Sequence, residues 1–271
     1  MRAVNLSSGS DGNLTYIESE NAKILIDIGL SCKETEKRLA LLGVQGDQID
    51  AILITHEHSD HIKGLDVFAS KYKTRVYAHI DGWSAINNKI SRLISTQKWS
   101  FSECPFEIKD ITVTAFKVPH DASCCVGYSL VCGTHKISIA TDLGKIDDNI
   151  LKQLANSQLI YLESNHNVDL LRNNPNYTAM LKNRIFSTHG HLSNLESARA
   201  ISYLAQNGVK QVVLSHLSKE NNRPDLAYNE VCNYLKNLGI QEGVNIRIDV
   251  ATTQPLSLIH ISEPTRLGMI S

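Results

Sequence analysis

The chain has 271 residues, of which 42% are hydrophobic, 20% charged and 6% aromatic, and its formal net charge is −1. This composition is ordinary for a globular protein and excludes a disordered or fibrous chain. The balanced charge also excludes a bulk attraction for nucleic acid. Any polyanionic substrate must therefore be received by local positive charge, from metal ions, a basic stretch or helix N-termini.

The first part of the chain opens with strand patterns and then alternates strands with helices. Short alternating or apolar runs, bounded by Gly and Ser turns, predict strands. The expected strands are Ala3–Leu6, Leu14–Glu18, Lys23–Asp27, Asp50–Thr55 and Arg75–Ala78. Helical spacing predicts helices at Cys32–Leu42, Ile62–Tyr72 and Gly82–Ser91.

The rest of the chain continues the alternation. Its expected strands are Ile111–Phe116, Gly127–Cys132, Lys136–Thr141, Leu159–Leu162, Gln211–Leu214 and Asn245–Asp249. Its expected helices are Asp147–Asn156, Asn194–Asn207 and Asp225–Leu238. There are no repeats and no linker long enough to separate two domains. The order therefore predicts one α/β (α+β) domain, a four-layer αββα sandwich with two sheets inside and helices outside.

The two ends of the chain bear on compartment and boundaries. The opening segment contains no apolar signal region, and the six cysteines show no CxxC spacing, which predicts a reduced, cytoplasmic protein. No run reaches the roughly 18 apolar residues of a membrane span, so no membrane partner is expected. Leu256–Arg266 reads LSLIHISEPTR and resembles the translation of a transposase adapter used for sequencing libraries. We therefore expect the domain at residues 1–255 and a non-native tail at residues 256–271.

A dense set of metal-ligand residues follows the apolar strand predicted at Asp50–Thr55. The segment ITHEHSDHIKG contains His56, His58, Asp60 and His61 within six positions. Neutral imidazole is the commonest metal ligand in proteins. Alternation on an extended chain would place the first two histidines on one side, and a turn into the next helix would bring the other two residues toward a second point. A lone histidine would be typical of a solvated turn, whereas these four predict two adjacent metals.

This HxHxDH motif resembles the defining motif of the metallo-β-lactamase superfamily. The resemblance implies three further ligands, each after a β-rich run: His120 in VPHDA, Asp142 in IATDLG and His216 in VVLSHLS. The implied arrangement is His56, His58 and His120 on one metal, Asp60, His61 and His216 on the other, and Asp142 as the bridge. Alternatives stay open, because His189 and His191 compete with His216 and because Asp142 before Leu-Gly is also typical of a turn.

A closer resemblance covers most of the chain. The segments LSSGSDGN, THEHSDHIKG, VPHDASCCVGY, ATDLG, LESNHN, GHLSN and LSHLSKENN are similar to those of the YycJ/WalJ branch of the superfamily. That branch consists of cytoplasmic enzymes regarded as 5′ to 3′ DNA exonucleases, so the resemblance implies DNA as the substrate. The chain departs from the branch at Cys125, Lys145 and Asn167, none of which is a presumed ligand.

The ligand types predict the chemistry. Imidazole and carboxylate donors without thiolate suit two divalent ions, Zn²⁺ or Mn²⁺. A water that bridges two such ions loses a proton near neutral pH and can attack a phosphodiester, with Asp60 and Asp142 holding the ions. The resemblance adds further catalytic and substrate-binding candidates, which are His166 and His191, and Ser164, Asn165, Ser193 and Asn194. The alternative for these polar residues is structural, since they could cap the helix that begins near Asn194.

Two weaker signals could also concern a phosphate. The turn from Ser7 to Asn13 could present backbone N–H groups, but such a turn is more typical of a hairpin. The basic residues Lys63, Lys71, Lys73 and Arg75 could contact a DNA backbone, although a solvated helix face is the more usual explanation.

Other functions remain possible on the same fold. A thioester or lactone hydrolase would use the same metals, so fold and metals do not separate it from a phosphodiesterase, and the polar SNH and GHLSN segments favour the phosphodiesterase. A di-iron oxidoreductase resembles HxExDH, whereas His58 stands at the second position here. A binding module without metals would have lost ligands, whereas all seven are present here. A β-CASP nuclease needs an inserted domain, and the separation of 74 positions from Asp142 to His216 leaves little room for one. The sequence carries no signal for an oligomeric state.

Overall fold

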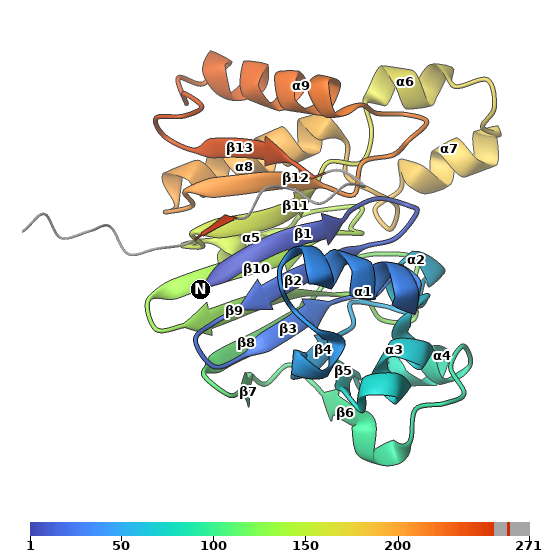
Figure 1. Cartoon of the computed structure of the whole chain (residues 1–271). Coiled ribbons are helices and arrows are strands. Elements are labelled where there is room, and N and C mark those ends of the chain that lie inside the picture. Colours follow the sequence, from blue (N-terminus) through green and yellow to red (C-terminus); the bar gives the residue numbers. More distant parts are fainter. Residues whose placement is uncertain (252–258, 261–271) are drawn as a thin grey trace, which may run out of the picture.

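A computed structural model of the protein describes residues 1–251 and 259–260. In this part of the chain, two seven-stranded sheets pack face to face and helices cover their outer surfaces (Figure 1). The predicted four-layer αββα sandwich is therefore confirmed. Most of the expected tail, residues 256–258 and 261–271, lies outside the described residues, so its boundary at residue 255 stays a prediction.

The first sheet comes mainly from the N-terminal part of the chain and has the order β14-β1-β2-β3-β4-β5-β6. Its strands are β1 (Arg2–Ser7), β2 (Leu14–Glu18), β3 (Lys23–Ile26), β4 (Ala51–Leu53), β5 (Arg75–His79), β6 (Lys98–Phe101) and β14 (Ile259–His260). Helices α1 (Cys32–Leu41), α3 (Leu65–Tyr72) and α4 (Trp83–Asn87) cover its outer face. Leu39, Phe68 and Trp83 from these helices join strand residues in one buried apolar cluster.

The second sheet has the order β13-β12-β11-β10-β9-β8-β7. Its strands are β7 (Phe106–Ile108), β8 (Ile111–Lys117), β9 (Val126–Cys132), β10 (His135–Ala140), β11 (Leu159–Glu163), β12 (Gln211–Ser215) and β13 (Arg247–Val250). Helices α5 (Asp148–Leu154), α8 (Asn194–Gln206) and α9 (Pro224–Asn237) bury their apolar faces on it. A third apolar cluster, which includes Tyr77, Tyr128 and Tyr161, fills the space between the sheets.

Three short elements lie at one end of the sandwich, on the right in Figure 1. They are α2 (Ser59–Ile62), α6 (Val168–Asn173) and α7 (Ala179–Ile185). The carboxyl ends of β10, β11 and β12 meet at one edge because these strands pair in parallel, and β3 and β4 pair in the same way in the first sheet. The loops that follow these strands therefore converge.

Three residues just beyond the converging strands β3, β10 and β12 have left-handed backbones. Asp27, Asp142 and His216 follow β3, β10 and β12, with φ of 58°, 58° and 55°. This conformation costs a residue other than glycine about 1–3 kcal/mol and persists only where the surroundings enforce it. Such positions often belong to functional sites.

The structure corrects the sequence prediction in several elements. The helix expected at Ile62–Tyr72 is interrupted at Gly64, whose N–H donates to the carbonyl of Ile28 at 2.9 Å. A Cβ on Gly64 would lie 2.2 Å from the carbonyl oxygen of Leu30, so only glycine permits this close approach. The helix expected at Gly82–Ser91 ends at Asn87. The missed elements include β6, β7, β14, α6 and α7, together with the 3₁₀ turns Gly46–Gln48 and Ser95–Gln97.

Two observations bear on compartment. All six cysteines are free. Within residues 1–251 and 259–260, no helix has both the length and the apolar character needed to span a membrane. The cytoplasmic location stays a prediction.

Candidate metal centre

The loops at the converging strand ends surround a pocket with a volume of about 240 Å³. Five of the seven ligands predicted from the sequence line the pocket, and His56 and His61 belong to the same groups of donor atoms; we call this set of seven the strand-end wall. His56, His58, Asp60 and His61 lie between β4 and α3, and the others follow β8, β10 and β12. Another part of the lining, which we call the α7 wall, consists of Tyr177, Leu181, Arg184 and Ile185.

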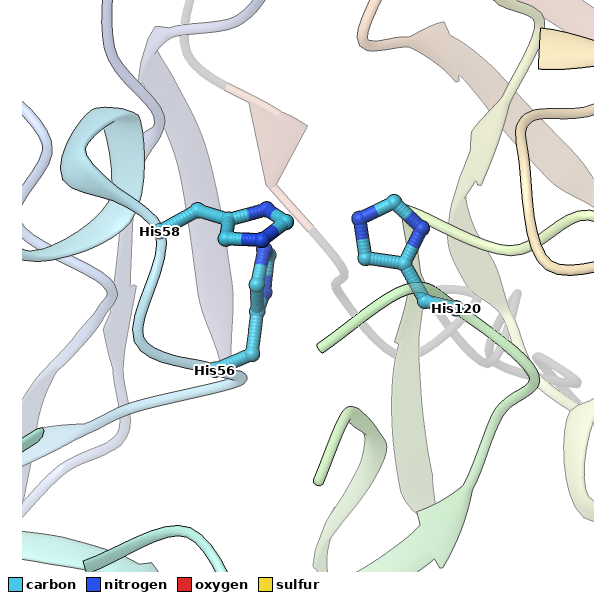
Figure 2. A group of neighbouring side chains, drawn as sticks. All are labelled: His56, His58 and His120. Carbon is cyan, nitrogen blue, oxygen red and sulfur yellow. The ribbon is translucent and has the colours of Figure 1, made fainter. Parts of the chain in front are cut away.

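The first group of ligand side chains is His56, His58 and His120. Figure 2 shows the rings of His58 and His120 facing each other, with His56 beside them. The ring centroids of His56 lie 4.5 Å from His58 and 5.1 Å from His120. One nitrogen from each ring lies within 4.8 Å of the others, which is a suitable arrangement for a single ion.

The second group is Asp60, His61 and His216, whose donor atoms also lie within 4.8 Å of one another. The Asp60 Oδ2 oxygen lies 3.5 Å from the Nε2 atoms of both His61 and His216. Asp142 lies between the two groups, because its carboxylate forms a further set with His56 and His61. Its Oδ2 oxygen is 3.3 Å from His61 Nε2. The structure thus brings all seven predicted ligands together.

The donor atoms of this cluster fit bound cations. Among the described residues, the buried atoms without a hydrogen-bond partner include the Nε2 atoms of His56, His120 and His216 and Oδ2 of Asp142. Buried polar atoms normally have partners, so four such atoms in one cluster need an explanation. Burial lowers the pKa of His56 well below its usual value, which keeps this ring neutral as a ligand must be. The residues therefore suit divalent ions held by N and O donors.

A second layer of hydrogen bonds orients two of the histidine rings. Nδ1 of His61 lies 2.7 Å from Oδ2 of Asp27, and Nδ1 of His120 lies 3.2 Å from the carbonyl oxygen of Gly190. Asp27 is itself held by Thr55, whose N–H and hydroxyl both donate to it at 2.8 Å. The partner at Nδ1 leaves Nε2 of His120 for a metal, as is usual for metal-binding histidines, whereas Nε2 of His61 also lies 3.0 Å from Nδ2 of Asn13.

Glu163 is the functional candidate that the sequence analysis missed. This last residue of β11 is fully buried, and its Oε1 lies 3.0 Å from Nδ1 of His216 and 2.7 Å from Nδ1 of His191. Its Oε2 accepts the N–H groups of Leu143 and Leu192. Both oxygens of the Glu163 carboxylate thus have two partners each. Through Oε1, Glu163 links the predicted ligand His216 to His191.

The three histidines that competed for the last ligand position occupy different surroundings. His189 is exposed and its Nδ1 lies near the Thr188 hydroxyl, so it is not part of the cluster. His191 lines the pocket and is 22% exposed. Burial alone would lower its pKa, but the Glu163 carboxylate outweighs burial and raises the pKa. His216 is the one whose donor atoms group with Asp60 and His61.

Three of the other predicted site residues, Ser164, Ser193 and Asn194, have structural roles. The Ser164 hydroxyl donates to Asn194, which is fully buried and bonded to Asn222 and Glu230. Ser193 caps α8, as the structural alternative held. None of these three lines the pocket, whereas Asn165 does, and its amide donates to the carbonyl of His216.

His166 is buried away from the pocket. Its ring packs against Phe186, with centroids 5.3 Å apart, and both ring nitrogens lack partners. Burial lowers its pKa to about 4, so the ring is neutral. His166 does not line the pocket and belongs to none of the ligand groups among the described residues.

The two weaker phosphate signals have separate outcomes. Within the turn from Ser7 to Asn13, two N–H groups are used internally, since Gly9 donates to the Asn13 side chain and Gly12 to the Gly9 carbonyl. Ser10 nevertheless lines the pocket. The predicted basic residues do not, and Lys71 pairs with Glu36. Among the described residues that line the pocket, Arg184 is the only lysine or arginine.

Comparisons with known proteins give the same fold and a family. Residues 22–217 match the family model described as the beta-lactamase superfamily domain. The exodeoxyribonuclease WalJ of Streptococcus pneumoniae is 37% identical over 246 residues, which cover 90% of this chain and 91% of that protein. The exodeoxyribonuclease YycJ of Bacillus anthracis is 36% identical over 251 residues, covering 92% and 94%. The metallo-beta-lactamase fold protein YhfI from Bacillus subtilis aligns over 96% of this chain and 100% of its own, with a TM-score of 0.71 and 18% identity, which shows the fold.

Proposed function

Because the chain belongs to the metallo-β-lactamase superfamily and, within it, to the family of the WalJ and YycJ exodeoxyribonucleases, we propose that it is a metal-dependent exodeoxyribonuclease that degrades DNA from the 5′ end. The observation that carries the proposal is the convergence of two groups of metal-ligating side chains beside one carboxylate in a single pocket. DNA as the substrate is supported by relatives that match over nine-tenths of the chain.

The fold implies divalent metal ions, and we propose two per chain, Zn²⁺ or Mn²⁺. His56, His58 and His120 would hold one, Asp60, His61 and His216 the other, and Asp142 would contact both. When bound, such ions supply Lewis acidity toward water and toward the oxygens of a phosphodiester. The residues supply the geometry, because the Nδ1 contacts of His61, His120 and His216 fix their rings.

His191 is the best-placed residue for the remaining proton transfer. Hydrolysis forms one bond from a water oxygen to phosphorus and breaks the bond to the leaving 3′ oxygen, which must gain a proton. His191 lines the pocket, and Glu163 holds its Nδ1, which leaves Nε2 free to carry that proton. The same role for His166 is not supported, because its ring lies outside the pocket.

A second candidate function is hydrolysis of a thioester or lactone. The observation that favours it is the α7 wall, where the apolar side chains of Leu181 and Ile185 face the same pocket as the metal ligands. An acyl group could pack against such a surface.

One assay separates the two functions. The purified protein, reconstituted with Mn²⁺ or Zn²⁺, is given duplex DNA labelled at the 5′ or the 3′ end and, in parallel, a panel of thioesters and lactones. We expect release of the 5′ label as mononucleotide and no acyl hydrolysis. Elemental analysis of the same protein should give two metal ions per chain. Acyl hydrolysis without DNA degradation would overturn the proposal, and a stoichiometry that never exceeds one would remove the dinuclear centre.

A further inference from the structure

The α7 wall lines the same pocket as five of the predicted metal ligands. From its chemistry we infer that it binds the terminal nucleotide of the DNA strand, with the Arg184 guanidinium on a backbone phosphate and with Tyr177 and Leu181 against the base or sugar. This inference rests on the proposed exodeoxyribonuclease function and names the surface that would hold its substrate. It also replaces the role first expected of Ser164, Ser193 and Asn194.

Helix α7 is unusual because none of its side chains is buried. The other helices of comparable or greater length bury apolar residues against a sheet, whereas Leu181 and Ile185 remain half-exposed along the pocket. Tyr177, just before the helix, is half-exposed at the same pocket. An apolar and aromatic surface that the described chain leaves partly open is suited to a base or a sugar, because a nucleobase stacks on an aromatic ring and a deoxyribose packs on aliphatic groups.

Arg184 supplies the local positive charge that a DNA substrate needs at this pocket. The overall net charge gives no general attraction for DNA, and the pocket itself contains the carboxylates of Asp60, Asp121 and Asp142. Arg184 pairs with Asp121, and the side chain of Arg184 is 62% exposed. The Asp121 side chain is 27% exposed, so solvent reaches both partners of this pair, and a phosphate can replace Asp121 by accepting two N–H groups of the guanidinium.

The position of α7 is nevertheless fixed relative to the metal ligands. Gly190 lies under the carboxyl end of the helix, where an added Cβ would come within 2.1 Å of the Ile185 carbonyl oxygen. The carbonyl of Gly190 in turn lies 3.2 Å from Nδ1 of His120, and the N–H of His191 donates to Ile185. Backbone contacts thus fix the position of α7 relative to His120, while the side chains of the α7 wall remain open to a ligand.

The test compares Arg184→Gln and Arg184→Lys with Lys182→Gln, a matched control on the same helix. Lys182 donates to the Arg172 carbonyl and does not line the pocket. Binding of a fluorescent 5′-phosphorylated oligonucleotide to the metal-free proteins is followed by anisotropy over a series of salt concentrations. The KM and kcat for the same oligonucleotide are measured with Mn²⁺, and circular dichroism verifies folding.

For Arg184→Gln we expect KM to rise about tenfold with a smaller change in kcat. The slope of log affinity against log salt should fall by about 0.7, the loss of one phosphate contact on a single strand. Arg184→Lys should keep the slope, because the charge remains, and raise KM less. Lys182→Gln should match wild type. If Arg184→Gln matches Lys182→Gln while DNA is still degraded, the inference falls and the proposed function stands. If wild type neither binds nor degrades DNA, the proposed function itself falls.

Discussion

Most side chains of the strand-end wall are buried, with His58 and Asp60 half-buried, whereas the α7 wall carries side chains that remain partly in solvent. His56, His61 and Asp142 are at most 2% exposed, while Arg184 is 62% exposed. The first wall stands on parallel strands of two packed sheets, and the second on a seven-residue helix without a buried side chain. Chemistry on phosphorus needs ligands held in place, and a rigid sheet provides this. A substrate that varies in base sequence needs a surface that tolerates change, which exposed side chains provide.

The two walls therefore predict different responses to substitution. Changes on the strand-end wall should abolish metal binding or turnover. Changes at Glu163, which contacts a ligand of that wall, should weaken both. Changes on the α7 wall should alter substrate affinity while leaving metals and stability nearly unchanged.

The largest effect is expected from Asp142→Asn. The amide is nearly isosteric with the carboxylate, so the buried surroundings of residue 142 should accept it. Its charge is lost, however, and a neutral amide would compensate poorly for the two cations proposed at this site. We expect DNA hydrolysis at saturating metal to fall by about 10²-fold or more, the scale of removing one electrostatic stabiliser of a transition state.

Circular dichroism serves as the folding control for this variant. A rate close to wild type would mean that Asp142, with its left-handed backbone after β10, is only a turn residue. The strand-end wall would then lose its bridging ligand.

Most of the strand-end wall could be predicted from the sequence because its residues sit where strands end. His56 to His61 follow an apolar run at close spacing, and Asp142 and His216 each end a β-rich run. Glu163 ends the apolar run LIYLE in the same way, between the strands that carry Asp142 and His216. A carboxylate at the end of a completely buried strand was the available signal for it, since such a charge requires partners.

The α7 wall could not be predicted in the same way. Helices α6 and α7 are short and bury almost nothing, so they lack the apolar periodicity that identified the longer helices. Only their caps, Asn167 and Thr178, indicated them. The break at Gly64 was also invisible, because it depends on the carbonyl of Leu30, which is distant in sequence.

His216→Ala and His191→Ala should separate a ligand from a neighbour that carries a proton. His216→Ala removes a donor from the second group, so we expect elemental analysis to show close to one metal per chain. His191→Ala should keep both metals and lower kcat, because His191, whose Nδ1 contacts Glu163, is proposed to transfer a proton and not to bind a metal. The reverse pattern of metal content would place the last ligand at His191.

Glu163→Gln should give a smaller loss on the same wall. The carboxylate Oε1 is shared by Nδ1 of His191 and of His216, and an uncharged amide would hold both rings less firmly. We expect metal affinity at the second site to fall about tenfold, which is typical of removing a partner of a ligating histidine. Titration against a competing chelator measures it. Unchanged affinity with a reduced kcat would show that Glu163 acts through His191 alone.

The smallest effect on stability is expected from Leu181→Ala on the α7 wall, compared with Leu204→Ala in α8. Leu204 is completely buried in the cluster between the second sheet and its helices. Its truncation removes contacts and leaves a cavity, which costs about 2–5 kcal/mol of unfolding free energy. Leu181 is half-exposed and packs into no core, so its truncation should cost about 0.5 kcal/mol or less. Urea unfolding of both variants measures the difference. The same Leu181→Ala protein should show a raised KM for the oligonucleotide, because the side chain that would cover the nucleotide is missing. A loss of stability as large as that of Leu204→Ala would show that α7 is part of the core, and the contrast between the two walls would then be wrong.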